Sequence, residues 1–458
     1  MIKDISDFKN VFFIGVAGVG MSAIAQYLQG IGKEVSGSDR YFNPNEENKI
    51  RTQLEAEGIQ CFLQNGEGIS EKTDVIVAST AIEDTVLEIV KAKELRIPIL
   101  RRSELLAMIA KSKKTIAIAG TSGKSTTSAM LYQILLDAKL EPSIISGAGL
   151  TSIIKQGKIG NAAVGNGDWL IIEADESDGS VVQYHPEIGV LLNIDKDHQE
   201  IDELIDLFTI FKNNTNSLFV VNQSNTLAKS LSENSKNDFG FEDGNAGFSA
   251  KNFSQNGFQL KFELQDQLFE MNALGQHSVE NAAAAIAVAL QIGVSAKTCA
   301  ESLKHYEGIY RRHQILGEKN GVWVIDDYAH NPAKCAASIK ACQPLAEKVI
   351  AWFQPHGYKP TRFLRADFVE EIGNALREND EIWMSEIFYA GGTAKKDISA
   401  NDLIQDLQKN RKNAHFVENR EDFLETIRPN LKEGTVLLLM GARDPSLEEF
   451  GADLFEQL

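Results

Sequence analysis

Short runs of hydrophobic residues alternate with helix-like patterns along most of the chain. The first run, Val11-Phe12-Phe13-Ile14, ends in glycines and precedes a helical pattern from Met21 to Leu28. Two further runs, at 34–37 and 74–78, end in Ser38-Asp39 and Ser79-Thr80. Apolar runs of this length are typical of strands buried on both faces. Their alternation with helices predicts a parallel, doubly wound sheet that ends near Lys111.

The same alternation recurs twice. A strand at 115–119 leads into a glycine-rich loop and a helix from about Lys124 to Ala138, and strands at 169–172 and 188–192 follow. A polar stretch from about 225 to 270 is consistent with a small antiparallel insert. A third unit begins around Gly317, with strands at 322–325, 349–353 and 436–440.

We therefore predict an α/β protein of three domains. A Rossmann-like domain covers 1–110, a central domain of the P-loop ATPase type covers 111–313, and a second Rossmann-like domain covers 314–458. A length of 458 residues agrees with two to four domains.

Charge and cysteine content narrow the class of protein. The chain has 46 basic and 64 acidic residues and a net charge of −18, which argues against nucleic acid or an anionic membrane as the main partner. Its four cysteines include no CxxC pair and are predicted to be reduced thiols. The N-terminus does not resemble a signal peptide, and no apolar segment approaches the ~18 residues of a membrane span. We expect a cytoplasmic protein.

The loop after the strand 115–119 is predicted to bind the phosphates of ATP. A strand leads in and a helix leads out, and glycines let backbone N–H groups surround phosphate oxygens. Lys124 is predicted to contact the terminal phosphates, and the hydroxyl of Ser125 to ligate Mg²⁺. A strand-to-helix turn without a ligand is the alternative. The loop comprises Gly120, Thr121, Ser122, Gly123, Lys124, Ser125, Thr126 and Thr127.

A second glycine-rich loop follows the first strand. Gly15, Gly18 and Gly20 have GxxGxG spacing, and Asp39 ends the next strand, where an acidic residue meets a ribose in dinucleotide-binding folds. The alternative is that these glycines serve only close packing of helix and strand. Two such loops indicate two different nucleotides or nucleotide-linked groups.

Acidic and histidine residues follow two strands of the central unit. Glu173 lies at the end of the strand 169–172, where a carboxylate is well placed for Mg²⁺. His198, beyond the strand 188–192, is predicted to be a neutral imidazole ligand of a second metal ion. An exposed acidic turn and a surface histidine are the respective alternatives.

Two motifs belong to the start of the third unit. Arg311-Arg312-His313 lies at the predicted domain junction, where an arginine stabilises phosphoryl charge once domains close. The alternative is a basic pair on the surface. The segment 326–332, Asp-Asp-Tyr-Ala-His-Asn-Pro, follows a strand, and its alternative is a plain turn before a helix.

Taken together, these motifs resemble the Mur ligase family, and within it the branch that adds alanine. The resemblance spans nearly the whole chain in the expected order. It is carried by GVAGVGMSAIA (15–25), VSGSD (35–39), IPILRRSELLA (97–107), AGTSGKSTTSAM (119–130), EADESD (173–178), NIDKDH (193–198), GQHSVENAAAA (275–285), RRH (311–313), DDYAHNP (326–332) and FQPHGY (353–358).

The resemblance implies an ATP-dependent ligase that activates the carboxylate of UDP-N-acetylmuramate as an acyl phosphate, which the amine of L-alanine then attacks. It implies ATP and Mg²⁺ as cofactors, and a monomer or homodimer. It assigns the UDP-sugar to Gly15, Gly18, Gly20 and Asp39, its diphosphate to Ser79 and Thr80, phosphates and two Mg²⁺ ions to Lys124, Ser125, Glu173 and His198, adenine to His277 and Asn281, phosphates to Arg312, the ATP ribose to Asp327, and the amine substrate to His330 and His356.

The chain departs from the family pattern in the amine region. The alanine-adding branch has arginines one and four positions after Gln-Pro-His, where this chain has Gly357 and Pro360, with Lys359 and Arg362 nearby. A recycling ligase that adds a murein tripeptide, or a ligase for another amino acid, therefore stays open. An oxidoreductase would leave the loop 120–127 and the acidic metal motifs unexplained. Intact Lys124, Glu173 and His198 argue against a binding protein without catalysis.

Overall fold

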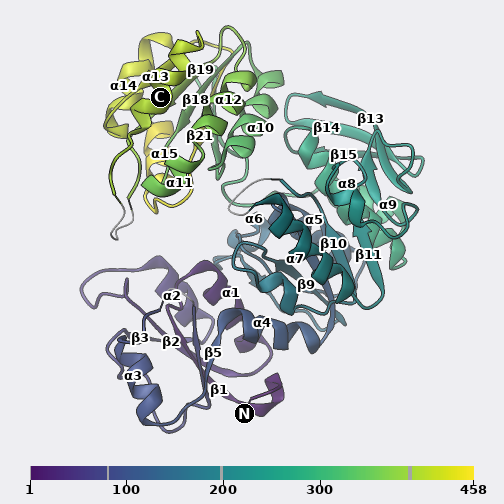
Figure 1. The fold of residues 1–458 in the computed structure, drawn as a ribbon, viewed down its shortest axis with the longest axis vertical. Coiled ribbons are helices and arrows are strands. Elements are labelled where there is room, and N and C mark those ends of the chain that lie inside the picture. Colours follow the sequence, from purple (N-terminus) through teal and green to yellow (C-terminus); the bar gives the residue numbers. More distant parts are fainter. Residues whose placement is uncertain (1, 80–81, 196–199, 390–394) are drawn as a thin grey trace. The chain divides into compact units, whose positions relative to one another are not determined.

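A computed structural model describes residues 2–79, 82–195, 200–389 and 395–458 (Figure 1). It confirms the predicted α/β class, with parallel strands in each of the main sheets. The chain divides into two compact units. Unit 1 comprises Met1–Asn252, Glu263–Phe269 and Glu280–Ile309, and unit 2 comprises Phe253–Phe262, Glu270–Val279 and Tyr310–Leu458. The three predicted domain ranges stay a prediction.

The N-terminal sheet of unit 1 is parallel, with the order β3-β2-β1-β4-β5. Val11 and Phe13 pack with α1 and α4 on one face, whereas Phe12 and Ile14 pack with α3 on the other. The whole apolar run is therefore buried. The elements are β1 (Asn10–Ile14), α1 (Val19–Gly30), β2 (Glu34–Asp39), α2 (Lys49–Ala56), β3 (Gln60–Leu63), β4 (Val75–Ala78), α3 (Leu87–Glu94), β5 (Ile99–Arg101) and α4 (Arg102–Lys111).

The central sheet of unit 1 has the order β11-β10-β6-β9-β7-β8, and only the pairing of β8 with β7 is antiparallel among the described strands. Strand β6 lies between β10 and β9, so the loop after β6 has both neighbouring strand ends beside it. The elements are β6 (Lys114–Ala119), α5 (Lys124–Asp137), β7 (Ser143–Ile145), α6 (Thr151–Ile154), β8 (Ala162–Ala163), β9 (Trp169–Ala174), β10 (Ile188–Leu191), α7 (Ile201–Asn213), β11 (Leu218–Val221), α8 (Gln276–Gln291) and α9 (Ala296–Lys304).

The polar stretch predicted as an antiparallel insert forms a sheet in the order β12-β13-β14-β15. Its strands are β12 (Phe239–Phe241), β13 (Phe248–Asn256), β14 (Gln259–Leu264) and β15 (Gln267–Asn272). The first pair, β12 and β13, is parallel rather than antiparallel. The prediction was wrong for this pair because the loop 242–247 returns the chain to the end at which β12 starts, so that β13 runs in the same direction as β12. Gly247 is packed there against the Lys236 carbonyl.

The sheet of unit 2 has the order β16-β17-β21-β18-β19-β20, with β16 antiparallel to β17. Helices α10, α12 and α13 contribute to the core on one face, and α14 and α15 to the core on the other. The elements are β16 (Gln314–Lys319), β17 (Val322–Asp327), α10 (Pro332–Cys342), β18 (Lys348–Phe353), α11 (Tyr358–Phe363), α12 (Arg365–Ala375), β19 (Glu381–Met384), α13 (Ala400–Lys409), β20 (Ala414–Phe416), α14 (Phe423–Ile427), β21 (Thr435–Met440) and α15 (Leu447–Gln457).

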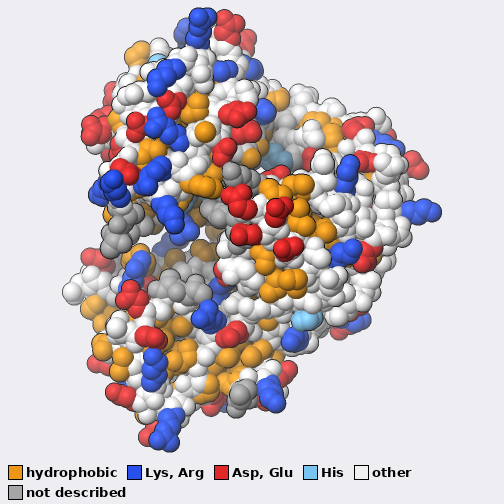
Figure 2. All heavy atoms as spheres, in the orientation of Figure 1, with side chains coloured by type: hydrophobic (Ala, Val, Ile, Leu, Met, Phe, Trp, Pro, Cys, Tyr) orange, Lys and Arg blue, Asp and Glu red, His pale blue; other side chains and the backbone are white. Residues whose placement is uncertain are grey.

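Charged side chains of both signs are dispersed over the face shown in Figure 2. All four cysteines are buried and unpaired, as the sequence predicts. Within the described part of the chain, no helix is long and apolar enough to cross a membrane.

Candidate active site

The loop between β6 and α5 has the backbone that its glycines allow. Gly120 and Gly123 have φ angles of 135° and 84°, in the region that favours glycine. A β-carbon at Gly123 would lie 2.3 Å from Oδ1 of Asn281 in α8, so a side chain does not fit there. Asn281 also accepts a hydrogen bond from Thr127 Oγ1 at 3.3 Å. The structure thus brings Asn281, which we expected near adenine, directly against the phosphate loop.

Lys124 begins α5 and is held at the loop by a buried ion pair. Its Nζ donates to the Gly120 carbonyl at 2.7 Å and to Glu176 Oε2 at 2.6 Å, and Asp175 lies at 3.9 Å. Only 15% of the Lys124 side chain and 7% of the Glu176 side chain are exposed. Burial alone would lower the pKa of Lys124, but Glu176 and Asp175 outweigh burial and raise it. Lys124 therefore stays charged, which binding a phosphate requires.

Ser125 and Glu173, the two predicted Mg²⁺ ligands described here, lie together. Ser125 Oγ donates to Glu173 Oε2 at 3.0 Å. The other oxygen of Glu173 accepts from Ser146 Oγ at 2.7 Å and from the Gly147 amide at 2.6 Å. A hydroxyl beside an oriented carboxylate is an oxygen donor set that fits a hard divalent cation.

The third predicted metal ligand cannot be placed beside this pair. His198 lies outside the described residues. Among the side chains that the structure does describe, no group of three His, Cys, Asp or Glu has the geometry of a metal site. The fit to Mg²⁺ accordingly rests on Ser125 and Glu173, with Ser146 orienting the carboxylate.

Asn193, which we did not select from the sequence, fixes the phosphate loop. It follows β10, and its Oδ1 accepts from the Ser122 amide at 2.8 Å and from Thr121 Oγ1 at 2.9 Å, while its Nδ2 donates to the Ser122 carbonyl at 3.1 Å. The side chain thus pairs with the backbone of Ser122 in both directions. The only signal in the sequence was the position of Asn193 at the end of a strand beside the loop, in the motif NIDKDH.

The first glycine loop is shaped by the end of β2. Gly15 has a φ of 81°, and the Gly15 and Val16 amides donate to the Ser38 carbonyl at 2.7 and 3.0 Å. Asp39 is 4% exposed, and its carboxylate accepts from the backbone amides of Ala17 and Tyr41 at 2.9 and 3.0 Å. Asp39 therefore orders the loop, and its contact with a ribose stays a prediction.

Residues predicted to contact the diphosphate follow β4. Ser79 comes directly after the last residue of that strand, and β4 pairs with β1, whose end carries the glycine loop. Ser79 is therefore at the same sheet edge as Gly15. Thr80 lies outside the described residues.

In unit 2, the neighbouring arginines 311 and 312 have different environments. Arg311 Nε and Nη2 donate to the two oxygens of Asp326 at 2.7 and 3.1 Å, and Nη2 also donates to the Gly441 carbonyl at 3.1 Å. The guanidinium of Arg312 lies 5.1 Å from the ring centroid of Tyr328. Arg311 therefore forms a structural ion pair with Asp326, and Arg312 is the candidate phosphate ligand.

Asp327 is the centre of a buried polar cluster in unit 2. Its carboxylate accepts from the His313 amide at 3.1 Å and from the hydroxyl of Ser338. Burial would raise the pKa of Asp327, but His313 and Arg312 lower it below its usual value. The His277 ring lies 5.3 Å from that of His313, and burial, with His313 beside it, lowers the pKa of His277 to about 4. His277 is therefore neutral at neutral pH.

The two histidines predicted for the amine substrate lie together. The rings of His330 and His356 are 5.6 Å apart, and His330 Nδ1 lies 2.9 Å from the Tyr328 carbonyl oxygen. Burial, with Lys334 nearby, lowers the pKa of His330 to about 3. A neutral imidazole with so low a pKa is suited to accept a hydrogen bond rather than a proton at neutral pH.

The departures from the family pattern fall at the start of α11, next to His356. Gly357 has a φ of 72° and precedes the helix, and Pro360 lies in its first turns. Arg362 forms an ion pair with Asp397 at 2.5 Å. Of the two nearby cations, Arg362 is thus neutralised within unit 2, and Lys359 is exposed.

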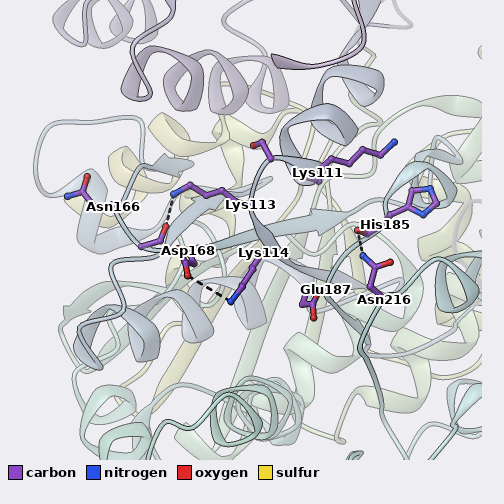
Figure 3. A pocket seen from close by; sticks show the side chains of 11 residues that line it. Lys111, Lys113, Lys114, Asn166, Asp168, His185, Glu187 and Asn216 are labelled. Carbon is purple, nitrogen blue, oxygen red and sulfur yellow. Dashed lines mark hydrogen bonds and ion pairs between the residues drawn. The ribbon is translucent and has the colours of Figure 1, made fainter. Parts of the chain in front are cut away.

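A cavity of about 670 Å³ opens at the opposite end of the central sheet (Figure 3). It is lined by residues that precede or begin β6, β9 and β10, among them Lys113, Lys114, Asp168 and Glu187. Lys113 Nζ is bound to the Gly167 carbonyl at 2.7 Å. None of the residues selected from the sequence lines this cavity, so we place the chemistry at the other end of the strands.

Comparison with known proteins gives the same family along the chain. Residues 10–114 match the model for the Mur ligase family catalytic domain, 118–289 the Mur ligase middle domain, and 311–443 the Mur ligase glutamate ligase domain. The UDP-N-acetylmuramate–L-alanine ligase of Carboxydothermus hydrogenoformans is 34% identical, covering 94% of this chain and 93% of its own. That of Bdellovibrio bacteriovorus is 33% identical, covering 94% and 95%.

Solved structures resemble the chain over nearly its full length. UDP-N-acetylmuramate-alanine ligase from Thermotoga maritima has a TM-score of 0.79 at 25% identity, with 98% of each chain covered. A murein peptide ligase from Psychrobacter arcticus has a TM-score of 0.67 at 20% identity, with 98% of each covered, which indicates a shared fold.

Asn193→Asp should weaken nucleotide binding at the phosphate loop. The variant keeps the shape of the side chain but replaces the Nδ2 donor with an oxygen that faces the Ser122 carbonyl, so the loop loses its fixed backbone. We expect ATP affinity to fall about tenfold, as measured by calorimetry. Asn216→Asp, beside the cavity at the other end of the sheet, is the control and should bind ATP normally. Equal affinity in Asn193→Asp and the parent would contradict this role.

His277 should make the stability of the chain depend on acid pH. Its pKa in the folded chain, about 4, lies below the ordinary 6.5, so the unfolded chain binds more protons between these values. The contribution of neutral His277 to the free energy of unfolding is therefore fully present above pH 6.5, and it is lost as pH falls towards 4. In His277→Gln we expect the decrease in the free energy of unfolding to be smaller by on the order of 1–3 kcal/mol, measured by urea denaturation across this range. The exposed His305→Gln is the control, and a decrease unchanged in His277→Gln would be evidence against this assignment.

Proposed function

The chain belongs to the Mur ligase family, and we propose that it joins L-alanine to the carboxylate of UDP-N-acetylmuramate in an ATP-dependent reaction. The observation that carries the proposal is the charged Lys124 of the phosphate loop, whose side chain is 15% exposed, beside the Ser125–Glu173 pair. The alanine ligases named above share about a third of their residues with this chain over nearly its full length.

The reaction has two steps. A carboxylate oxygen of UDP-N-acetylmuramate attacks the γ-phosphorus of ATP, and the bond to ADP breaks to leave an acyl phosphate and ADP. The amine of alanine then attacks the acyl carbon, and the tetrahedral intermediate expels phosphate to leave an amide. The amine loses a proton in this step, and His330 and His356 are the residues that we propose lie near it.

Lys124 supplies positive charge to the first step. It is paired with Glu176 in the structure, so binding the phosphates of ATP requires that it exchange this carboxylate for phosphate oxygens. The backbone amides of residues 120–126 surround the same phosphates. Because the phosphoryl group carries its charge on several oxygens, most of the catalysis comes from positioning and charge neutralisation.

Ser125 and Glu173 would hold Mg²⁺, which neutralises phosphate charge when bound. The hydroxyl and carboxylate oxygens lie 3.0 Å apart, and Ser146 and Gly147 orient the carboxylate. His198 is proposed as a ligand of a second ion.

The remaining assignments follow from the family and from the geometry within each unit. The neutral His277 and Asn281 would contact the adenine, Asp327 the ribose of ATP, and Arg312 its phosphates. In unit 1, the loop 15–20, ordered by Asp39, would hold the UDP-sugar, with Ser79 and Thr80 near the diphosphate.

Alanine is the amine that we propose, because the two relatives named above, which match more than nine tenths of the chain at over 30% identity, are alanine ligases. Gly357 and Pro360 do not provide the arginines of that branch, and Arg362 is paired with Asp397. The carboxylate of alanine must therefore be bound by another group, and the amine is the part of the proposal that needs a direct test.

The purified chain should release ADP and phosphate when it is given ATP, Mg²⁺, UDP-N-acetylmuramate and L-alanine. Glycine, L-serine and the murein tripeptide are tested in parallel, and mass spectrometry identifies the amide product. We expect alanine to give the highest kcat/KM. Turnover with the tripeptide and none with alanine would reject alanine as the substrate and identify the chain as a recycling ligase.

Lys124→Ala should abolish turnover while UDP-sugar binding persists. The variant removes the only lysine of the phosphate loop, so we expect kcat to fall by at least ~10³-fold, in the range found when a group that stabilises transition-state charge is removed. UDP binding, measured by calorimetry, should persist. Lys114→Ala, at the opposite end of strand β6, is the control for a lost lysine. Normal turnover in Lys124→Ala would refute the assignment of the loop.

A further inference from the structure

Arg102, in the motif RRSELLA, has no assigned role, yet it lies against the first glycine loop. It is the first residue of α4, directly after β5. A β-carbon at Gly20 would be only 3.0 Å from its Nη1 and 3.3 Å from its Cδ. The guanidinium thus occupies the space that the missing side chain of Gly20 leaves open, in the first turn of α1.

Asp178 fixes the orientation of this guanidinium. Arg102 Nη2 donates to Asp178 Oδ2 at 2.8 Å, and the other oxygen of Asp178 accepts from the Ser180 amide at 2.9 Å. The side chains of Arg102 and Asp178 are 25% and 30% exposed. The pair is therefore partly open to solvent, and a ligand can reach the guanidinium.

The turn that carries Asp178 also carries the partner of Lys124. Glu176 lies two residues earlier, and the Gly179 amide donates to its carbonyl at 3.0 Å, which keeps the turn compact. Lys124 and Arg102 are thus bound to neighbouring carboxylates of one turn, one cation at each glycine loop.

Such a cation would add to the first loop a full positive charge that the loop itself does not carry. The segment 15–20, Gly-Val-Ala-Gly-Val-Gly, contains no basic residue, and the chain carries a net charge of −18. Backbone amides at the start of α1 supply only partial positive charge. Arginine presents five N–H donors in a planar fork that suits phosphate oxygens, and Asp178 occupies one edge of this fork.

We propose that Arg102 is a further substrate-binding residue, whose guanidinium, oriented by Asp178, binds the diphosphate of the UDP-sugar at the loop 15–20. This inference rests on the proposed function, which places the UDP-sugar at that loop. It is consistent with the glycine at position 20, since a β-carbon there would press against the guanidinium. It also gives the motif RRSELLA a role, because Arg102, the first residue of α4, lies beside Gly20 of α1.

The test is titration of the full-length chain with UDP in the absence of ATP, by calorimetry. We expect Arg102→Ala to weaken UDP binding about 10- to 100-fold, the effect of one charged hydrogen-bonding group. Arg102→Lys, which keeps the charge without the fork, should lie in between. Arg101→Ala removes the adjacent, exposed arginine of the same motif and should bind UDP as the parent does.

Steady-state kinetics and the variant Asp178→Asn distinguish a residue that contacts the substrate from one that only fixes α4 to the turn of Asp178. We expect Arg102→Ala to raise the KM for UDP-N-acetylmuramate with little change in the KM for ATP, and Asp178→Asn to weaken UDP only about threefold. A purely structural role would instead give equal losses of UDP affinity in both variants. It would also raise the KM for ATP, because the same turn carries Glu176, the partner of Lys124.

Equal UDP affinity in Arg102→Ala and Arg101→Ala would overturn the proposal, and so would equal losses in Arg102→Ala and Asp178→Asn. If Arg102→Ala does not fold, Arg102→Lys decides in the same way, by comparison with Arg101→Ala. A parent chain that binds no UDP would instead refute the placement of the UDP-sugar in the proposed function.

Discussion

The buried ion pair between Lys124 and Glu176 is the interaction on which the arrangement of unit 1 depends. It places a charged amine at the phosphate loop and holds the turn after β9 against that loop. Removing one partner of such a pair leaves an uncompensated buried charge, which costs about 3–5 kcal/mol. Through Asp178 the same turn reaches Arg102 and the first glycine loop. The loops of the two predicted nucleotide sites are thereby bound to one short segment.

Parallel sheets explain why these groups meet. Strands β6, β9 and β10 run side by side, so the loop 120–127, Glu173 and Asn193 all lie at the carboxyl edge of one sheet. The strands are buried on both faces and carry little besides apolar residues, which leaves their ends as the places for polar chemistry. The cavity at the amino edge shows the contrast, because its Lys113 is bound to backbone carbonyls.

In unit 2, too, polar residues lie at the end of a buried parallel strand, but their chemistry differs. Asp327, at the end of β17, is kept ionised by His313 and Arg312, while burial keeps His277 and His330 neutral. A negative carboxylate and neutral imidazoles suit hydrogen bonding to a nucleoside and to an amine. Gly357 and Pro360 at the start of α11 differ from the family pattern, so the amine site is the part of the chain for which the resemblance is weakest.

The sequence by itself determined the α/β class, the alternation of the main buried strands with helices, and the positions of Lys124, Ser125 and Glu173 at strand ends, because apolar periodicity and glycine spacing are local properties. It did not determine that β12 and β13 are parallel or that Asn193 pairs with the backbone of the phosphate loop. It also did not indicate that Arg311 forms an ion pair with Asp326, or that the side chain of Arg102 packs beside Gly20. Only the tertiary structure decided these, since each depends on which strand ends become neighbours and on the space that remains between them.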